Sequence, residues 1–295
     1  MRSRVAVFIL LAAVSALAQQ QADPNFDAKV ARPAYKAGEG PKVLLDEAHF
    51  NFHTCDGRYK PFCDLIANDG YRVAPNKEKF SAKSLDGRQV LVISNALGAA
   101  AMGSKEASRP AFTEEECDAV AAWVGGGGAL LLIADHAPMG AAAENLGKRF
   151  GVDMSKGWTV DGDTSQLYFS RGDGRLKDHP MTRGRDSTER INRVRTFTGQ
   201  SLRGPEGAAV LLALADSAID VLPDKTQQPA AGRAQGIAMR HGKGRVVVLG
   251  EAAMMSAQVV QIPGKESLQM GMNVPGIDNR QLALNILRWL SGALD

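Results

Sequence analysis

The chain of 295 residues has few cysteines, few aromatic residues and no excess of charge of one sign. Three Cys residues cannot build a disulfide-dense scaffold, so the fold must rest on a hydrophobic core, which the 44% of apolar residues can supply. The same apolar content excludes an intrinsically disordered chain. The 35 basic and 32 acidic residues leave a net charge of +3, which gives no electrostatic support for nucleic-acid or membrane-surface binding. We therefore expect a globular protein without a nucleic-acid partner.

The first eighteen residues have the pattern of a secretory signal peptide. Arg2 and Arg4 form a basic start, residues 5–14 are apolar, and residues 15–18 read Ser-Ala-Leu-Ala, which has small residues at the cleavage positions. The apolar run is shorter than the roughly 20 residues of a membrane-spanning helix. We therefore expect cleavage after residue 18, a solvated leader over residues 19–40, no membrane span in the mature chain, and a periplasmic or secreted protein.

Export changes the interpretation of the cysteines. Cys55 and Cys63 lie eight positions apart, and an oxidising compartment favours a disulfide between them. Cys117 is left over. It follows Thr113, which begins a capping box with Glu116 at the start of an expected helix, and a small buried hydrophobe is its favoured role.

From residue 41 onward, short apolar runs alternate with amphipathic segments. The expected strands cover residues 43–45, 71–73, 89–94, 129–134 and 245–249, the last forming a hairpin with residues 235–240. The expected helices cover residues 61–68, 113–124, 141–150 and 279–290. Strands that are apolar on both faces and separated by helices indicate a parallel sheet covered on both sides. We predict a single α/β domain over residues 41–295, with a doubly wound, mainly parallel sheet and a β-rich insertion at about 155–235.

Polar side chains cluster directly after the expected strands. In an open parallel sheet, ligands bind in the crevice at the carboxyl ends of the strands. We therefore predict one ligand-binding cleft, with Phe50 and Phe52 as an apolar wall. Its polar residues are Asp46, His49, Asn51, His53, Asn95, Asp135, His136 and Glu251. The competing interpretation is that each of these residues caps a helix or satisfies a loop backbone.

Three stretches resemble a known superfamily. Residues 123–138 (Trp-Val-Gly-Gly-Gly-Gly-Ala-Leu-Leu-Leu-Ile-Ala-Asp-His-Ala-Pro), 242–251 and 278–290 are similar to the class I glutamine amidotransferase-like superfamily, and more narrowly to its uncharacterised bacterial envelope-associated branch. The resemblance implies a flavodoxin-like three-layer sandwich in which the first strand and the strand before Asp135 lie close together.

The chain departs from the superfamily where its enzymes carry their chemistry. Those enzymes place a nucleophilic Cys in a Gly-x-Cys-x-Gly elbow and a His-x-Glu pair later in the chain. Here the elbow reads Asp135-His136-Ala137-Pro138, and the late strand ends in Gly250-Glu251 with no His beside it. Thiolate attack on an amide needs a positioned sulfur and an imidazole base. We therefore expect no glutaminase activity.

Two functions remain open at this point. The first is binding of a small polar ligand, such as a carbohydrate or another envelope-derived molecule, at the rim of the sheet. The second is hydrolysis, with His136, Asp135 and His49 as candidate catalytic residues. A divalent metal is an option within the second, because imidazoles and carboxylates are suitable ligands. Its candidate ligands are His49, His53, Asp135 and His136.

Overall fold

The chain folds into a mixed α/β domain that is built around one large sheet. The computed structural model describes residues 19–261 and 267–295, so the expected signal peptide lies outside the described residues. Within that part of the chain, nine strands form the central sheet in the order β3-β2-β4-β5-β15-β14-β10-β6, with β11 pairing to β14. The parallel strands are β2 (Lys42–Asp46), β3 (Arg72–Asn76), β4 (Val90–Ser94), β5 (Ala129–Ile133) and β15 (Gly244–Leu249). The antiparallel strands are β6 (Asp153–Met154), β10 (Leu202–Arg203), β11 (Ala209–Ala213) and β14 (Ala234–His241). The predicted mainly parallel sheet and the hairpin of β14 and β15 are confirmed.

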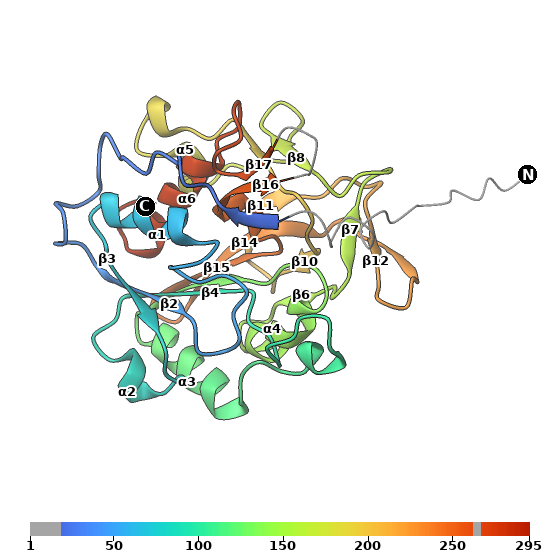
Figure 1. Cartoon of the computed structure of the whole chain (residues 1–295), viewed down its shortest axis with the longest axis horizontal. Coiled ribbons are helices and arrows are strands. Elements are labelled where there is room, and N and C mark those ends of the chain that lie inside the picture. The colour runs from blue at the N-terminus through green and yellow to red at the C-terminus, as the bar shows by residue number, and fades with distance from the viewer. Residues whose placement is uncertain (1–18, 262–266) are drawn as a thin grey trace, which may run out of the picture.

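The helices cover both faces of this sheet (Figure 1). One face packs against α1 (Lys60–Asn68) and α6 (Asn279–Leu290), and the other against α2 (Ala82–Leu85), α3 (Glu114–Gly125) and α4 (Met139–Arg149). Neighbouring residues of β4 and β5 alternate between the two hydrophobic clusters, and all of them are buried. Burial on both faces explains why these strands read as continuous apolar runs in the sequence. Thr113 and Glu116 form the expected capping box of α3.

The predicted insertion is rich in short antiparallel strands. A three-stranded sheet consists of β7 (Trp158–Val160), β12 (Ile219–Val221) and β13 (Gln227–Pro229), and a hairpin consists of β8 (Tyr168–Ser170) and β9 (Arg193–Arg195). Short helices add to it: α5 (Pro180–Arg183) and the 3₁₀ turn η2 (Ser187–Glu189). Two further 3₁₀ turns, η1 (Lys105–Ser108) and η3 (Ala253–Met255), follow β4 and β15.

Residues 20–39 are exposed or half-buried, as a solvated leader would be, but parts of the segment pack on the domain. Strand β1 (Gln19–Ala22) pairs with β16 (Ala257–Gln261), which pairs in turn with β17 (Leu268–Gly271). Phe26, Val30 and Tyr35 then pack against the hydrophobic core. These scattered apolar side chains have no helical or strand period, which is why the sequence pattern does not reveal their contact with the core.

The cysteines lie as expected. Cys55 and Cys63 form a disulfide with their Cα atoms 5.7 Å apart, and this joins the loop after β2 to α1. Cys117 is a free thiol buried in the core under α3. Among the helices in the described ranges, none is long and apolar enough to cross a lipid bilayer.

Candidate functional site

A cavity of about 520 Å³ lies where β4, β5 and β15 end. Five of the residues predicted for the ligand site line it: His53, Asn95, Asp135, His136 and Glu251. The three strands are neighbours in the sheet, so the residues that follow them meet at one edge. Residues that follow β4, β5 and β15 therefore meet in this one cavity.

Asn95 joins two of these strand ends. Its backbone has a φ of 50°, in the left-handed region that Asn tolerates better than most residues. The side-chain oxygen of Asn95 accepts a hydrogen bond of 2.9 Å from the backbone N–H of Asp135. The backbone N–H of Asn95 donates a hydrogen bond of 2.9 Å to the Ile133 carbonyl. Asn95 thereby sets the position of the chain just after β5.

Asp135 and Glu251 form a buried carboxyl pair. The Glu251 carboxylate accepts hydrogen bonds from the backbone N–H groups of Ala253 at 2.9 Å and Met254 at 2.8 Å. Burial nevertheless raises the pKa of Glu251 well above its usual range, and the neighbouring Asp135 carboxyl raises it further. Burial also raises the pKa of Asp135. Since both shifts oppose ionisation, the pair retains a proton far more readily than two exposed carboxyls would.

The two imidazoles of the cavity are held in different ways. The His136 Nδ1 lies 2.7 Å from the Ala137 carbonyl oxygen, which can only accept, so Nδ1 carries the proton and a neutral ring has its lone pair on Nε2. Among the described residues, this Nε2 has no hydrogen-bond partner. His53 places Nδ1 3.0 Å from the Ser94 hydroxyl and stacks on Tyr59. Burial, together with the charge of Arg58, lowers the pKa of His53 to about 3, so this ring is neutral at physiological pH.

Much of the remaining wall comes from segments outside the predicted strand ends. Trp158 of β7 stacks on His136 with ring centroids 5.6 Å apart, and the Lys225 ammonium lies 5.9 Å from the Trp158 ring centroid. Further lining residues are Gln20, Phe52, Met102, Ala137, Pro138, Met139, Phe197, Thr198, Gln258, Ala253 and Met270. Of the two aromatics expected as a wall, Phe52 lines the cavity, and Phe50 is 56% exposed. Trp158, as one of three Trp residues, is the one signal in the sequence that could have pointed to the insertion.

Asp46, His49 and Asn51 belong to a different cluster, which corrects the prediction that all eight residues share one cleft. The His49 Nδ1 lies 2.9 Å from an Asp46 oxygen, and its Nε2 lies 2.8 Å from a Glu116 oxygen. Asn51 donates to Asp46 at 3.0 Å and accepts from the His49 backbone N–H at 3.0 Å. The imidazole packs against Phe80 and Phe112, so it faces α3 and not the cavity.

The charge state of this cluster follows from its contacts. Burial disfavours the imidazolium, but the hydrogen bonds and charges of Asp46 and Glu116 outweigh burial and raise the pKa of His49. Burial likewise opposes ionisation of Glu116, and hydrogen bonds from the Thr113 backbone and from His49 overcome it and lower the pKa of Glu116. The raised pKa favours the charged form of His49, which links Asp46 at the end of β2 to Glu116 of α3.

The four candidate metal ligands do not form a common donor set. Both ring nitrogens of His49 are taken by carboxylates, and the His53 ring is hydrogen-bonded to Ser94. Across residues 19–261 and 267–295, no group of three or more His, Cys, Asp or Glu side chains is arranged to hold a metal ion.

Cys117 does not supply the missing nucleophile. Its side chain is fully buried, and burial raises the pKa of its thiol to about 12. A thiol with that pKa is protonated at physiological pH and is a poor nucleophile. The cavity is lined by neither of the other two cysteines, which form the disulfide.

Comparison with known proteins shows similarity in fold alone. No family model matches the chain, and no curated protein matches it. Among solved structures, the N-terminal domain of mmIFT52 is similar with a TM-score of 0.57 and 12% identity, over 84% of this chain and 96% of that one. A ThuA-like protein from Bacteroides uniformis has a TM-score of 0.47 and 15% identity, over 91% of this chain and 95% of that one. A GMP synthase component from Thermoplasma acidophilum has a TM-score of 0.43 and 12% identity, over 86% and 94%. At these identities, what the chain shares with the first of them is a mixed α/β fold.

Proposed function

We propose that the protein binds a small, uncharged polar ligand, such as a sugar or another polyol, in the cavity at the ends of β4, β5 and β15. The proposal rests on one observation above all, the convergence of Asn95, Asp135, His136 and Glu251 on a single cavity. The cavity volume of about 520 Å³ falls within the range of roughly 300–1,000 Å³ that is usual for small-molecule sites.

The protonation states favour an uncharged ligand. The raised pKa values of Asp135 and Glu251 favour the protonated carboxyl form, which can donate as well as accept hydrogen bonds. The lowered pKa of His53 leaves a neutral ring. A strongly charged ligand would find little opposite charge here beyond Lys225, and burying it would be costly. Hydroxyl groups can pair with all of these side chains.

The aromatic walls favour a ligand that also has an apolar face. Phe52, Trp158 and Phe197 line the cavity beside the polar groups. Ligand sites of this kind combine apolar and aromatic walls with a few polar groups that fix orientation. A sugar ring suits both kinds of wall, because the C–H groups on its faces can pack on the aromatic rings and the hydroxyls at its edge can bond to the polar groups.

We also propose that the protein is exported and lacks glutaminase activity. The Cys55–Cys63 disulfide supports export, because such bonds persist in oxidising compartments. The buried, protonated thiol of Cys117 and the absence of a Cys after β5 argue against thiolate chemistry.

A panel of neutral monosaccharides and sugar alcohols tests the binding proposal. We expect at least one member to raise the melting temperature, since a ligand that binds the folded state stabilises it by mass action. Calorimetric titration with that sugar should show that the His136→Ala variant binds it at least about tenfold more weakly than the wild type does. The control variant His241→Ala, which removes an imidazole from the β14–β15 hairpin, should bind it as tightly as the wild type. Equal affinity of His136→Ala and wild type, or no effect of any member, contradicts the proposal.

Hydrolysis remains the second candidate, because a carboxyl pair with raised pKa values next to an imidazole with a free Nε2 can act as general acid and base. The same panel, extended to the corresponding glycosides and acetate esters, distinguishes the two. Release of a product that is lost in Asp135→Asn, while that variant still binds the parent sugar, would establish hydrolysis. Binding of the sugar without release of any product would support ligand binding as the function.

A further inference from the structure

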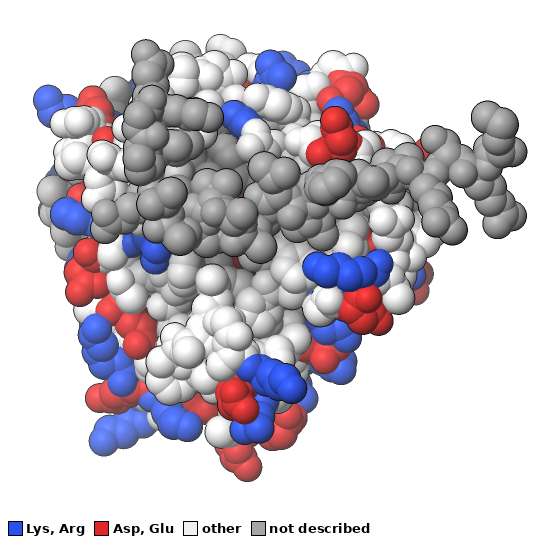
Figure 2. All heavy atoms as spheres, turned by 45° about the vertical axis from the view of Figure 1, so that its right-hand side comes forward, with Lys and Arg blue, Asp and Glu red and all other residues white. Residues whose placement is uncertain are grey.

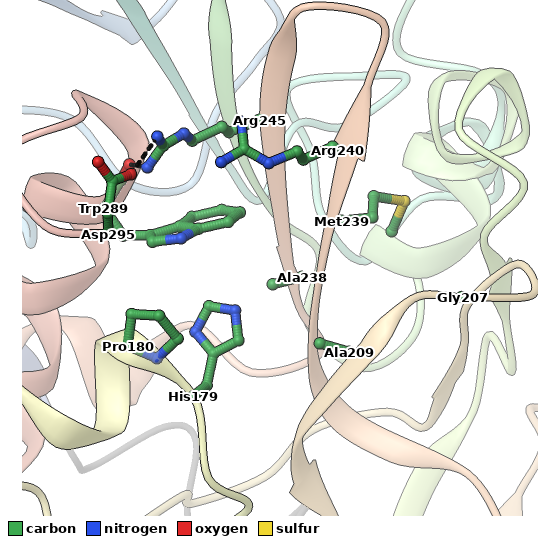
Figure 3. Close-up of a pocket in the computed structure, with 10 residues that line it drawn as sticks. All are labelled: His179, Pro180, Gly207, Ala209, Ala238, Met239, Arg240, Arg245, Trp289 and Asp295. Carbon is green, nitrogen blue, oxygen red and sulfur yellow. Dashed lines mark hydrogen bonds and ion pairs between the residues drawn. The ribbon is translucent and has the colours of Figure 1, made fainter.

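A second cavity, of about 440 Å³, lies beside the β14–β15 hairpin (Figure 3). Its walls come from β11, β14 and β15 on one side and from α5 and α6 on the other. The lining residues are His179, Pro180, Gly207, Ala209, Ala238, Met239, Arg240, Arg245, Trp289 and Asp295. None of these described residues lines the first cavity, so what this second cavity does is independent of the function proposed above.

Two arginines face each other across the hairpin. Arg240 of β14 and Arg245 of β15 are direct cross-strand partners, and Figure 3 shows both side chains at the edge of the cavity, with the Arg245 guanidinium turned toward Asp295 and the Arg240 guanidinium beside the Arg245 side chain. Like charges at directly opposite positions of an antiparallel pair destabilise the pairing. An arrangement of this kind is stabilised when an anion lies between the two guanidinium groups.

Internal partners compensate only one of the two charges. Arg245 donates to the backbone carbonyls of Trp289 at 2.6 Å and Leu294 at 3.2 Å, and it forms an ion pair with the Asp295 carboxylate. Arg240 is exposed and, within the described chain, has no ion-pair or hydrogen-bond partner. One positive charge at the cavity edge is therefore open to an external anion.

The rest of the cavity suits an apolar body. The Trp289 ring lies beneath the two arginines, with the Arg245 guanidinium 5.2 Å from its centroid, and Pro180, Ala209 and Ala238 add apolar surface. His179 contacts the Trp289 ring edge to face. Burial lowers the pKa of His179 to about 4, so above that pH it adds no charge.

We propose that this second cavity binds a small organic carboxylate, whose carboxylate group bridges Arg240 and Arg245 and whose apolar body lies against Trp289 and Pro180. A planar carboxylate is preferred because its two oxygens match the paired N–H donors of guanidinium groups. The ion pair with Asp295 shows that a carboxylate fits at Arg245, and it makes the Asp295 side chain a competitor of the ligand.

Benzoate serves as the probe, with benzyl alcohol as the uncharged analogue of the same shape. Titration of the full-length protein, followed by NMR of the indole N–H signals, should show benzoate shifting the Trp289 signal and benzyl alcohol binding at least about tenfold more weakly. The Arg240→Gln variant should bind benzoate more weakly than the wild type by a similar factor. Lys243→Gln removes an exposed charge from the turn of the same hairpin, outside the cavity lining, and should leave the affinity unchanged.

Asp295→Asn gives a second, independent test, because removing the competing carboxylate should tighten benzoate binding several-fold. Asp295 is 74% exposed, so this variant is expected to fold normally. Equal binding of benzoate and benzyl alcohol, or an equal loss in Lys243→Gln and Arg240→Gln, would show that the arginine pair does not form a carboxylate site. Weaker binding in Asp295→Asn would overturn the proposal as well.

Discussion

At the scale of single residues, two histidines that follow strands of the central sheet, His136 and His49, lie in different surroundings. His136 and Asp135 follow β5 directly and line the first cavity, as the strand-end rule requires. His49 lies three residues beyond the end of β2, where the loop turns its side chain toward α3. The direction of a loop side chain depends on its tertiary partners, here Glu116, and a carboxylate 67 positions away carries no local pattern.

The raised pKa of His49 leads to a pH prediction. Because its pKa is raised in the folded state, the folded protein binds a proton more tightly than the unfolded chain does. The resulting stability is fully present below the unfolded pKa of about 6.5 and is lost as the pH rises through the folded pKa, with a slope of at most about 1.4 kcal/mol per pH unit. Urea unfolding at a series of pH values measures this loss.

Glu116→Gln provides the matched comparison for His49. Removing one of the two carboxylates lowers the folded-state pKa of His49, so the loss of stability should be smaller and should be complete at a lower pH than in the wild type. An NMR titration that places the His49 pKa below about 6.5 in the wild type would contradict this explanation.

At the scale of elements, prediction succeeded where one periodic pattern determined burial. The strands β2, β4, β5 and β15 and the helices α3 and α6 were found because continuous apolar runs and a capped amphipathic pattern are local signals. The strand β1 has no such local signal, because it is defined by its pairing with β16, more than 230 residues away. The insertion was recognised as β-rich, but its contact with the site depends on the packing of its short sheets.

Helix α6 also contains a buried charge that its amphipathic pattern does not predict. Arg288, with its side chain 1% exposed, donates to Asp69 after α1 at 2.8 and 2.7 Å and forms an ion pair with Glu189 at 3.0 Å. Arg288→Met should leave both carboxylates without their partner and lower the free energy of unfolding by about 3–5 kcal/mol. Lys60→Gln, which breaks the exposed ion pair with Asp64 on α1, should lower the free energy of unfolding by no more than about 1 kcal/mol. Similar losses in the two variants would show that the buried network is not what holds α6 to α1.

At the scale of the whole molecule, the first cavity is assembled from three parts of the chain. The strand ends supply the titratable groups, the insertion supplies Trp158 and Lys225, and the small sheet of β1, β16 and β17 supplies Gln20 and Gln258. On the face that Figure 2 shows, basic and acidic side chains are interspersed without a large patch of one sign. This agrees with the near balance of charges in the sequence and with a ligand selected by hydrogen bonding more than by long-range attraction.

The role of β1 in this assembly can be tested by comparing two shortened chains, one beginning at Gln19 and one beginning at Asp23. The second lacks the strand that pairs with residues 258–261 of β16, but it keeps Phe26, Val30 and Tyr35 against the core. We therefore expect both chains to fold, with a melting temperature lower by only a few degrees in the shorter one, since a four-residue edge strand contributes little burial. In the shorter chain, hydrogen–deuterium exchange of the β16 amides should be faster. The sugar identified by the panel should also bind it more weakly, because Gln20, which lines the cavity, is absent. Unchanged exchange and unchanged affinity would show instead that β17 alone holds β16 in place and that β1 takes no part in forming the site.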